Sequence, residues 1–408
     1  MSEPKQVYRL PPCHSFDIAA TESWLEDMAA RGYILAKDSF FGGVATFELG
    51  PPQKIRYRLE ATDTPSGLFS PNYDPEDDLI QLYHQMGWQY RGRRGQFFIF
   101  ATSDPDAPEL NTDPRIQAHT IQALAKYQRR QVVNTLFYWL FIGWLHFSSI
   151  LLSGTIAIGT PAMLLLLGLT AESLIRQITI VLRLEKLKKR LHSGETMPHK
   201  SDYTSRTLPY YSGKLIRFAL WILAFTLVFV HFPTDADAIA LTEHDGSFPF
   251  ATLQELYPEA EITPWESFMG SEVTAWSDFL APVCYEYTES SYVKLPDAPK
   301  DSMWLSVHYF DTRWEWTARI LSRELVHQAG ASPVHQFFDE LFGDEPIIVT
   351  ELDLPGVDYA AYYYRYRSFP YVVLRKGTQV LKANIDIFGE DTAFTPEEFA
   401  LTMADSMN

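Results

Sequence analysis

The sequence has few cysteines and lacks the short motifs that identify common catalytic sites. Its 408 residues contain two cysteines, Cys13 and Cys284. There is no Gly-rich phosphate loop, no Gly-x-Ser-x-Gly elbow and no His-Glu-x-x-His pattern. No pattern points to a reaction, so we expect a non-enzymatic protein with no catalytic residue, no metal and no cofactor.

Charge is also missing from one long stretch. No Asp, Glu, Lys or Arg occurs from residue 131 to residue 171, a run of 41 residues. One bilayer crossing needs only about 20 residues. We therefore predict two membrane helices, near 132–152 and 155–175, and a third near 215–232, where a second apolar block lies.

The start of the second membrane helix stays open between Thr155 and Pro161. From Thr155, Glu172 falls near the far interface and pairs with Arg176 at i,i+4 spacing. From Pro161, Glu172 falls near the middle of the bilayer, where a carboxylate indicates a functional site. We favour the pair with Arg176.

Basic residues indicate the orientation. They precede the first helix and fill the segment 176–214, whereas the predicted turn between the first two helices has none. The positive-inside rule then predicts a multi-pass protein of the cell membrane with a cytoplasmic N-terminus and an extracytoplasmic C-terminus. Within the cytoplasmic loop 176–214, apolar residues at helical spacing predict a helix on the membrane surface, and a short dimer seam, giving a homodimer, is the alternative. Its membrane-facing basic residues are Arg183, Lys186, Lys188, Lys189 and Arg190.

Net charge differs between the three parts of the chain. Residues 1–125 carry −6, residues 126–232 carry +9 and residues 233–408 carry −20. An acidic C-terminal part argues against nucleic acid as a partner. The expected partners are the lipid bilayer and either a protein or a small ligand.

The first 110 residues contain an internal repeat. Tyr8-Arg9-Leu10 and Tyr57-Arg58-Leu59 each lead into a helical pattern that closes at a glycine followed by an aromatic residue. The two corners are Gly32-Tyr33 and Gly87-Trp88. Each copy is predicted as strand, helix, strand, strand, and two copies would form an antiparallel sheet with helices on one face. A glycine at each helix end can adopt positive φ.

A set of spaced motifs in residues 5–110 resembles a known bacterial family. The resemblance is to domain of unknown function 2812 (DUF 2812), which implies a cytoplasmic module commonly followed by membrane helices, with no established activity and no functional residues to carry over. The motifs are Phe16-Asp17, Glu22, Trp24-Leu25, Met28-Ala29, Gly32-Tyr33, Phe47-Glu48, Tyr57-Arg58, Met86-Gly87-Trp88 and Phe97 to Ala101.

The duplicated order also occurs in small-molecule-binding domains whose halves enclose a groove, an analogy of fold alone. By that analogy Trp24, Tyr57, Trp88 and Tyr90 would line an aromatic ligand pocket. The alternative, which we favour, is that the four residues form the core.

The predicted domains are a cytoplasmic α+β domain at 1–110, a connecting helix at 111–131, the membrane region at 132–232 and an acidic extracytoplasmic α+β domain at 233–408. In the last, Thr395, Pro396 and Glu398 predict a helix start with a capping box. A strand over 359–366 places Tyr363, Arg365 and Arg367 on one face, a candidate external binding face for an anionic or aromatic group, with cross-strand packing as the alternative. The predicted strands are 279–287, 303–310, 346–352, 359–366, 371–375 and 379–385, and the predicted helices are 312–328, 334–342 and 396–404.

The expected function is that of a signalling protein, a sensor or regulator that links an external binding domain to a cytoplasmic domain. A structural or accessory subunit of a membrane complex is the alternative, and an extracytoplasmic hydrolase is the third.

Overall fold

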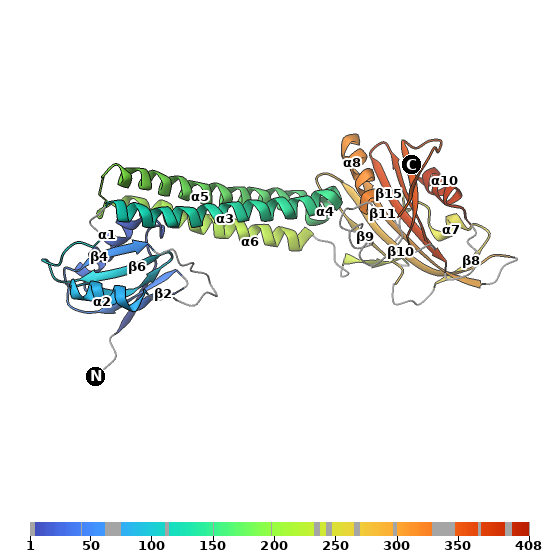
Figure 1. Cartoon of the computed structure of the whole chain (residues 1–408). Helices are drawn as coiled ribbons and strands as arrows, with labels where there is room; N and C mark the ends of the chain where they lie inside the picture. The colour runs from blue at the N-terminus through green and yellow to red at the C-terminus, as the bar shows by residue number, and fades with distance from the viewer. Residues whose placement is uncertain are drawn as a thin grey trace. The chain divides into compact units, whose positions relative to one another are not determined.

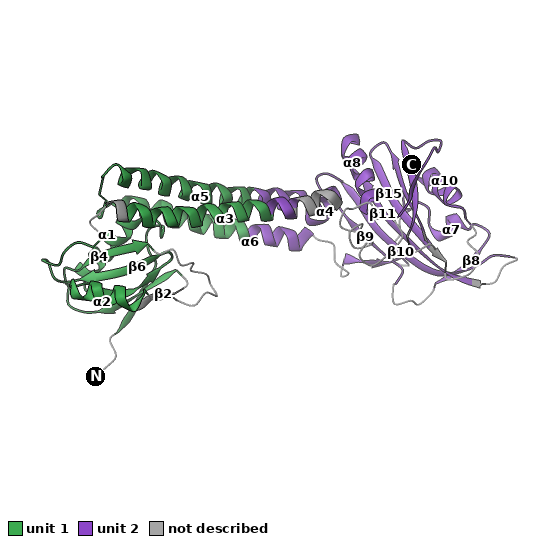
Figure 2. Cartoon of the chain, in the orientation of Figure 1, with its two compact units in different colours: residues 1–138, 168–221 green, residues 139–167, 222–408 purple. Residues whose placement is uncertain are grey.

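The computed structural model combines helices and β-sheets (Figure 1). The chain divides into two compact units, residues 1–138 with 168–221 and residues 139–167 with 222–408 (Figure 2), and each is described by itself. The structure describes residues 5–41, 43–61, 75–110, 114–149, 151–196, 198–231, 237–241, 247–264, 270–296, 300–328, 347–365, 369–387 and 394–407.

The N-terminal repeat has the predicted order of elements. The first copy comprises β1 (Gln6–Arg9), α1 (Ile18–Ala30), β2 (Tyr33–Phe41) and β3 (Val44–Leu49). The second comprises β4 (Arg56–Ala61), α2 (Asp77–Gln85), β5 (Gln89–Arg94) and β6 (Phe97–Thr102).

Each copy forms its own antiparallel sheet, whereas the sequence suggested one shared sheet. The strand orders are β1-β3-β2 and β4-β6-β5. The edge strands β2 and β5 contact each other, and both have an irregular register, between Leu35 and Phe40 and between Tyr90 and Gly92. Bulges disrupt the regular row of backbone donors and acceptors, which explains why pairing stops between the copies.

The two glycine corners are confirmed. Gly32 has φ 85° and Gly87 has φ 87°. The N–H of Gly32 donates to the carbonyl oxygen of Ala29 over 3.0 Å, and that of Trp88 donates to Tyr83 over 2.9 Å. Positive φ lets the chain leave each helix and turn the following aromatic residue toward the sheet.

A single helix, α3 (Pro114–Ser149), follows the repeat and extends beyond residue 131, where the predicted connecting helix ends. Its Ala118, Ile121 and Leu124 are buried in the same cluster as Trp24 and Tyr57. The N-terminal domain is therefore closed by the first part of α3.

The segment predicted as a basic loop with a membrane-surface helix is different in the structure. Helix α5 (Thr160–His192) continues through residues 176–192, and α6 (Thr204–His231) begins after a short link. Leu184 and Leu191, 3% and 1% exposed, belong to the N-terminal core. Part of the apolar face that the sequence analysis assigned to the membrane surface or a dimer seam therefore packs against the N-terminal domain, while Ile178 of the same face is 38% exposed.

Two helices, α5 and α6, are long and apolar enough to cross a membrane. Helix α5 starts at Thr160, directly after Gly159 with φ 95°, so the later of the two predicted starts is right. The first predicted span, 132–152, falls partly in α3 and partly in the short helix α4 (Leu151–Ile158), and neither qualifies within the residues searched.

The C-terminal domain is built on a nine-stranded sheet. Its order is β12-β13-β14-β15-β11-β10-β9-β7, with β8 paired to β10. The sequence analysis missed β7 to β9 and α7, and the predicted helix 334–342 lies outside the described residues. The elements are β7 (Ile239–Ala240), α7 (Leu253–Leu256), β8 (Glu261–Pro264), β9 (Glu272–Trp276), β10 (Val283–Lys294), β11 (Lys300–Asp311), α8 (Glu315–Val326), β12 (Val349–Leu352), β13 (Tyr359–Arg365), β14 (Phe369–Lys376), β15 (Gln379–Ile387) and α10 (Pro396–Ser406).

Both faces of this sheet are covered. Residues of α7 and α10 pack on one face, and residues of α8 and α4 pack on the other. In β13, Ala360 and Tyr362 contact the first cluster, while Ala361 and Tyr363 contact the second, because successive side chains point to opposite faces. Helix α4 thus completes the C-terminal domain.

Candidate functional site

A group of buried polar contacts in the second unit lies where the C-terminal domain meets α4. Glu324 of α8 is only 7% exposed. One carboxylate oxygen accepts the N–H of Leu152 over 2.6 Å, and the other accepts the N–H and the hydroxyl of Ser153 over 2.9 and 2.6 Å. The first N–H groups of a helix have no partner within it, so this carboxylate caps α4.

A second carboxylate caps the start of α5. Asp278, between β9 and β10, accepts the N–H of Thr160 over 2.7 Å and its hydroxyl over 2.5 Å. Nε2 of His231, the last residue of α6, lies 3.7 Å from the Asp278 carboxylate and 3.2 Å from the carbonyl oxygen of Ile156. We call Glu324, Asp278, Ser153, Thr160 and His231 the hairpin junction.

Gly159 allows His231 to pack directly against the backbone at the hairpin junction. A Cβ atom at Gly159 would lie 2.7 Å from Cγ of His231, besides the constraint of φ 95°. A side chain cannot be accommodated there unless His231 moves. The junction therefore brings the ends of α4, α5 and α6 together on the C-terminal domain.

In the first unit, the link between α5 and α6 contacts α1. We call residues 193–203 the connector. Nδ1 of His199 lies 2.9 Å from the carboxylate of Glu22, and the hydroxyl of Tyr203 donates to Asp27 over 2.8 Å. The N–H of Ser201 donates to the hydroxyl of Ser23 over 3.0 Å. Three residues of the connector thus contact one face of α1.

Buried charges reinforce this contact. Glu22 is 1% exposed and also accepts the N–H of Leu59 over 2.8 Å. Arg58 lies 3.9 Å from Glu22 and forms two hydrogen bonds with Glu109, from its Nε and, over 3.1 Å, from its Nη2. Burial raises the pKa of Glu22, while His199, Leu59 and Arg58 act in the opposite direction.

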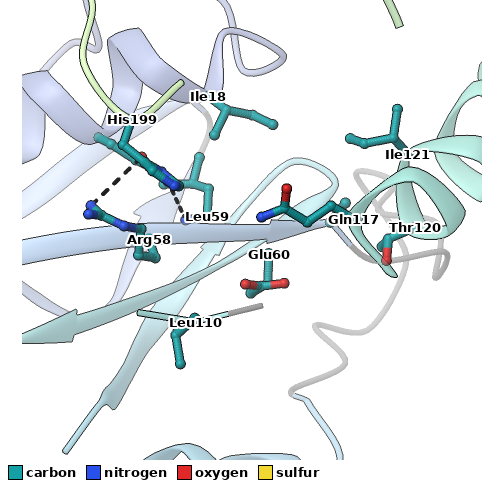
Figure 3. A pocket seen from close by; sticks show the side chains of 11 residues that line it. Ile18, Arg58, Leu59, Glu60, Leu110, Gln117, Thr120, Ile121 and His199 are labelled. Atoms are coloured by element: carbon teal, nitrogen blue, oxygen red, sulfur yellow. Dashed lines mark hydrogen bonds and ion pairs between the residues drawn. The ribbon is translucent and has the colours of Figure 1, made fainter. Parts of the chain in front are cut away.

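A small cavity lies beside this cluster. Arg58, His199, Gln117 and Ile121 are among its lining residues (Figure 3). Its volume is about 20 Å³, enough for a water molecule and far below the roughly 300–1,000 Å³ of ligand pockets. The cluster therefore attaches the connector to the domain and leaves no room for a substrate.

The four aromatic residues of the predicted pocket are not brought together. Trp24 and Tyr57 belong to one core cluster, and Trp88 and Tyr90 belong to another. Trp24 packs edge-on against Phe47 with ring centroids 5.5 Å apart. Three of the four are at most 5% exposed, so core packing describes their placement better than a shared pocket.

The predicted external binding face is also not formed as expected. Tyr363 is 1% exposed and stacks on Tyr371, with ring centroids 5.1 Å apart. Arg367 and the side chain of Arg365 lie outside the described residues. A buried tyrosine cannot offer an accessible surface, because β13 is covered on both faces.

The predicted basic residues lie on the last turns of α5. Arg183, Lys186, Lys189 and Arg190 are exposed, and Lys188 pairs with Glu185 over 2.8 Å. Within the part of the chain that the structure describes, no group of His, Cys, Asp and Glu is arranged to hold a metal ion.

The predicted pair of Glu172 with Arg176 is replaced by an interhelical one. Oε1 of Glu172 lies 3.0 Å from Nη1 of Arg217 on α6. The sequence pattern suggested the neighbour one turn away, but antiparallel packing of α5 and α6 offers Glu172 a cation on another helix. The side chains of both residues are partly exposed, 45% and 26%.

Sequence reasoning missed the contacts of the hairpin junction and those between the connector and α1. Glu324, Asp278 and His199 contact residues more than 100 positions away in the chain. Thr160 followed by Pro161 indicated a helix start, yet nothing in the sequence showed which carboxylate would cap it.

These features define a class of protein with two α+β domains, each completed by part of a set of long helices, two of which can cross a membrane by length and composition. Residues 17–132 match the family described as "Protein of unknown function (DUF2812)", which confirms the resemblance seen in the sequence. The match ends within α3, whose first part completes the N-terminal core, and the C-terminal region has no family match. No curated protein and no solved structure matches the chain.

Proposed function

We propose that the chain is a multi-pass membrane protein with three spans, a cytoplasmic N-terminus and an extracytoplasmic C-terminal domain. The lengths and apolar character of α5 and α6 support two spans. The uncharged residues 132–149 of α3 support the third. The basic residues of α5, Lys200 of the connector and the basic residues in the first half of α6 support the orientation.

We further propose that the protein is a non-enzymatic sensor or regulator. The observation that carries this proposal is the attachment of α5 at both ends. Thr160 is held by Asp278 of the C-terminal domain, and Leu184 and Leu191 are buried in the N-terminal core. A ligand or protein that binds one arrangement of the C-terminal domain more tightly would bias the position of α5.

The alternative is a structural or accessory subunit. It needs the same attachments of α5, but no conformational change has to pass from the C-terminal domain to the N-terminal domain. Both functions are compatible with the known contacts, so the distinction rests on coupling. Coupling is measurable as an effect at the connector of a change made at the hairpin junction.

The topology is tested with single cysteines in exposed positions. Native Cys13 and Cys284 are both buried and are poor probes. Ser103→Cys and Glu259→Cys place thiols at exposed sites of the N-terminal and C-terminal domains. An impermeant maleimide on intact cells should label only the second variant, with the unsubstituted protein as background. Labelling of residue 103 in intact cells contradicts the orientation.

Coupling is tested by amide hydrogen exchange on the full chain in lipid nanodiscs. Asp278→Asn removes one acceptor from the Thr160 cap, and exchange should become faster in the connector and in α1 as well as locally. Glu315→Gln, an exposed charge change on α8, is the control. Faster exchange confined to residues 139–167 and the C-terminal domain would favour the structural subunit.

A further inference from the structure

A large groove in the first unit lies between α5, α6 and the segment before α1. Its volume is about 910 Å³, at the upper end of the roughly 300–1,000 Å³ typical of ligand pockets. The apolar part of its wall comes from α5 and α6, and Ile175 is 64% exposed there. Phe16, from the segment before α1, also lines the groove, and the apolar and small residues that α5 and α6 contribute are Gly168, Ala171, Ile175, Ile180, Leu184, Leu187, Pro209 and Gly213.

The charged part of the wall has an excess of arginine. Four arginines line the groove, against the two carboxylates of Asp17 and Glu172. Both carboxylates already have a cation: Asp17 lies 3.7 Å from Arg206, and Glu172 lies 3.0 Å from Arg217. The other two arginines are Arg176 and Arg183.

Arg176 and Arg183 have no ion-pair partner among the residues that the structure describes. They are seven residues apart on α5, or about 10 Å along the helix axis, on one face. Both are exposed. Two unneutralised guanidinium groups beside an apolar wall suit a ligand that is anionic at one end and apolar at the other.

His14 reports the electrostatic field in the groove. Its pKa falls to about 4, first because the ring is buried and then because Arg176, Arg94, Lys214 and Arg183 surround it. The imidazole is therefore neutral at pH 7. Positive charge from α5 and α6 converges on this part of the groove.

Two glycines leave the groove open along its length. A Cβ atom placed on Gly168 of α5 or on Gly213 of α6 would meet nothing within 4 Å. Neither has a positive φ that would exclude a side chain. The space beside them is therefore free volume between the helices.

We propose that this groove binds an anionic phospholipid of the cytoplasmic leaflet, with Arg176 and Arg183 holding the phosphate and an acyl chain lying along Gly168 and Gly213. The inference rests on the proposed topology, in which the Arg183 end of α5 is cytoplasmic and Gly168 lies deeper. Basic pockets between membrane helices on this side favour lipid headgroups. A bound lipid would join α5, α6 and the segment before α1.

The site is tested by thermal unfolding of the purified full chain in dodecyl maltoside micelles. Dioleoyl-phosphatidylglycerol should raise the Tm in a saturable way, and dioleoyl-phosphatidylcholine should not. The double variant Arg176→Gln/Arg183→Gln should bind phosphatidylglycerol about thirtyfold more weakly. Each arginine near an anionic lipid surface contributes about 1 kcal/mol to binding, and the loss of two such contributions corresponds to about thirtyfold in affinity. Its Tm without lipid shows whether it is folded.

Two further variants distinguish a specific lipid site from non-specific electrostatic attraction between α5 and anionic lipid. Lys186→Gln/Lys189→Gln removes the same charge from exposed positions of α5 outside the groove and should keep the phosphatidylglycerol response. Gly213→Leu keeps every charge, fills the groove and should lose the response. Equal losses in the two double variants would overturn the proposal.

Other outcomes are equally decisive. An equal response to both lipids overturns the site, and a full response to sodium phosphate alone shows a site for free phosphate and overturns lipid binding. Extraction of membranes with alkaline carbonate keeps the two proposals apart. A chain that carbonate releases contradicts the three spans, whereas a retained chain that does not discriminate between the lipids contradicts only the lipid site.

Discussion

Glu172 of α5 and Arg217 of α6 form an ion pair across two helices, with Oε1 and Nη1 3.0 Å apart. In the proposed topology Glu172 is twelve residues from the start of α5, about 18 Å into a hydrocarbon core of about 30 Å. A carboxylate at that depth needs a cation or a proton. The pair therefore fixes the register of α5 against α6 in the part of the structure that also forms the groove.

We expect Glu172→Gln and Arg217→Gln each to lower the Tm of the full chain in detergent, because each leaves its partner's charge uncompensated. The reversed double variant Glu172→Arg/Arg217→Glu should recover most of the loss, since it restores the pair. A double-mutant cycle should give a coupling energy near the upper end of about 0.2–1 kcal/mol for partly exposed pairs, or above it in lipid. Strictly additive single effects would show that the pair contributes nothing.

The N-terminal repeat should need part of α3 to fold. Ala118, Ile121 and Leu124 are at most 1% exposed in the cluster that contains Trp24 and Tyr57. A fragment ending at residue 105 exposes that apolar surface, whereas one ending at residue 132 covers much of it. We expect the longer fragment to show a cooperative thermal transition at a higher temperature and less aggregation by light scattering. Equal behaviour of the two fragments would mean that the repeat is complete without α3.

The two glycine corners should differ in sensitivity. A Cβ at Gly32 would lie 2.6 Å from the carbonyl oxygen of Gly50, whereas at Gly87 its nearest neighbour is Cβ of Ala107 at 3.5 Å. Gly32→Val combines strain at positive φ with a backbone clash and should cost more than the ~1–3 kcal/mol of strain alone. Gly87→Val should stay within that range.

The measurement for the two glycines is chemical unfolding, with Gly213→Ala as control. Gly213 lies within α6 with open space around its Cβ position, so alanine should be neutral or stabilising. An equal loss of stability for Gly32→Val and Gly87→Val would show that the carbonyl of Gly50 moves away at little energetic cost and relieves the clash.

His14 should make the stability of the protein fall at acidic pH. Its pKa is lowered from 6.5 in the unfolded chain to about 4 in the folded one, so the folded state binds fewer protons between these values. Stability contributed by the neutral ring is complete above pH 6.5 and is lost as the pH falls toward 4. His14→Gln should flatten the decline of Tm over this window.

The control for His14 is His84→Gln, an exposed histidine on α2. Its Tm profile should follow that of the unsubstituted protein between pH 7 and 4. A decline of unchanged steepness in His14→Gln would show that other groups carry the acid sensitivity, Asp and Glu side chains among them.

Local features were readable from the sequence because each depends on residues close together in the chain. The repeat with its glycine corners, the capping box at Thr395 and Glu398, and the helix start at Thr160 follow from backbone φ, hydrogen-bonding capacity and apolar spacing within a few residues. The uncharged run and the second apolar block together predicted three spanning helices, and two helices of sufficient length, α5 and α6, are present among the described residues.

Tertiary structure decided which of these local features meet. Glu22 contacts His199 from a distance of 177 residues, and Glu324 contacts Ser153 from 171. The residues next to a carboxylate in the sequence do not indicate which distant donor will contact it. The sequence analysis therefore paired Glu172 with the nearest cation, Arg176. The long-range packing of α3 and α5 on the N-terminal domain also decided that Leu184 and Leu191 are buried in protein, since an apolar helix face is satisfied equally by lipid and by a core.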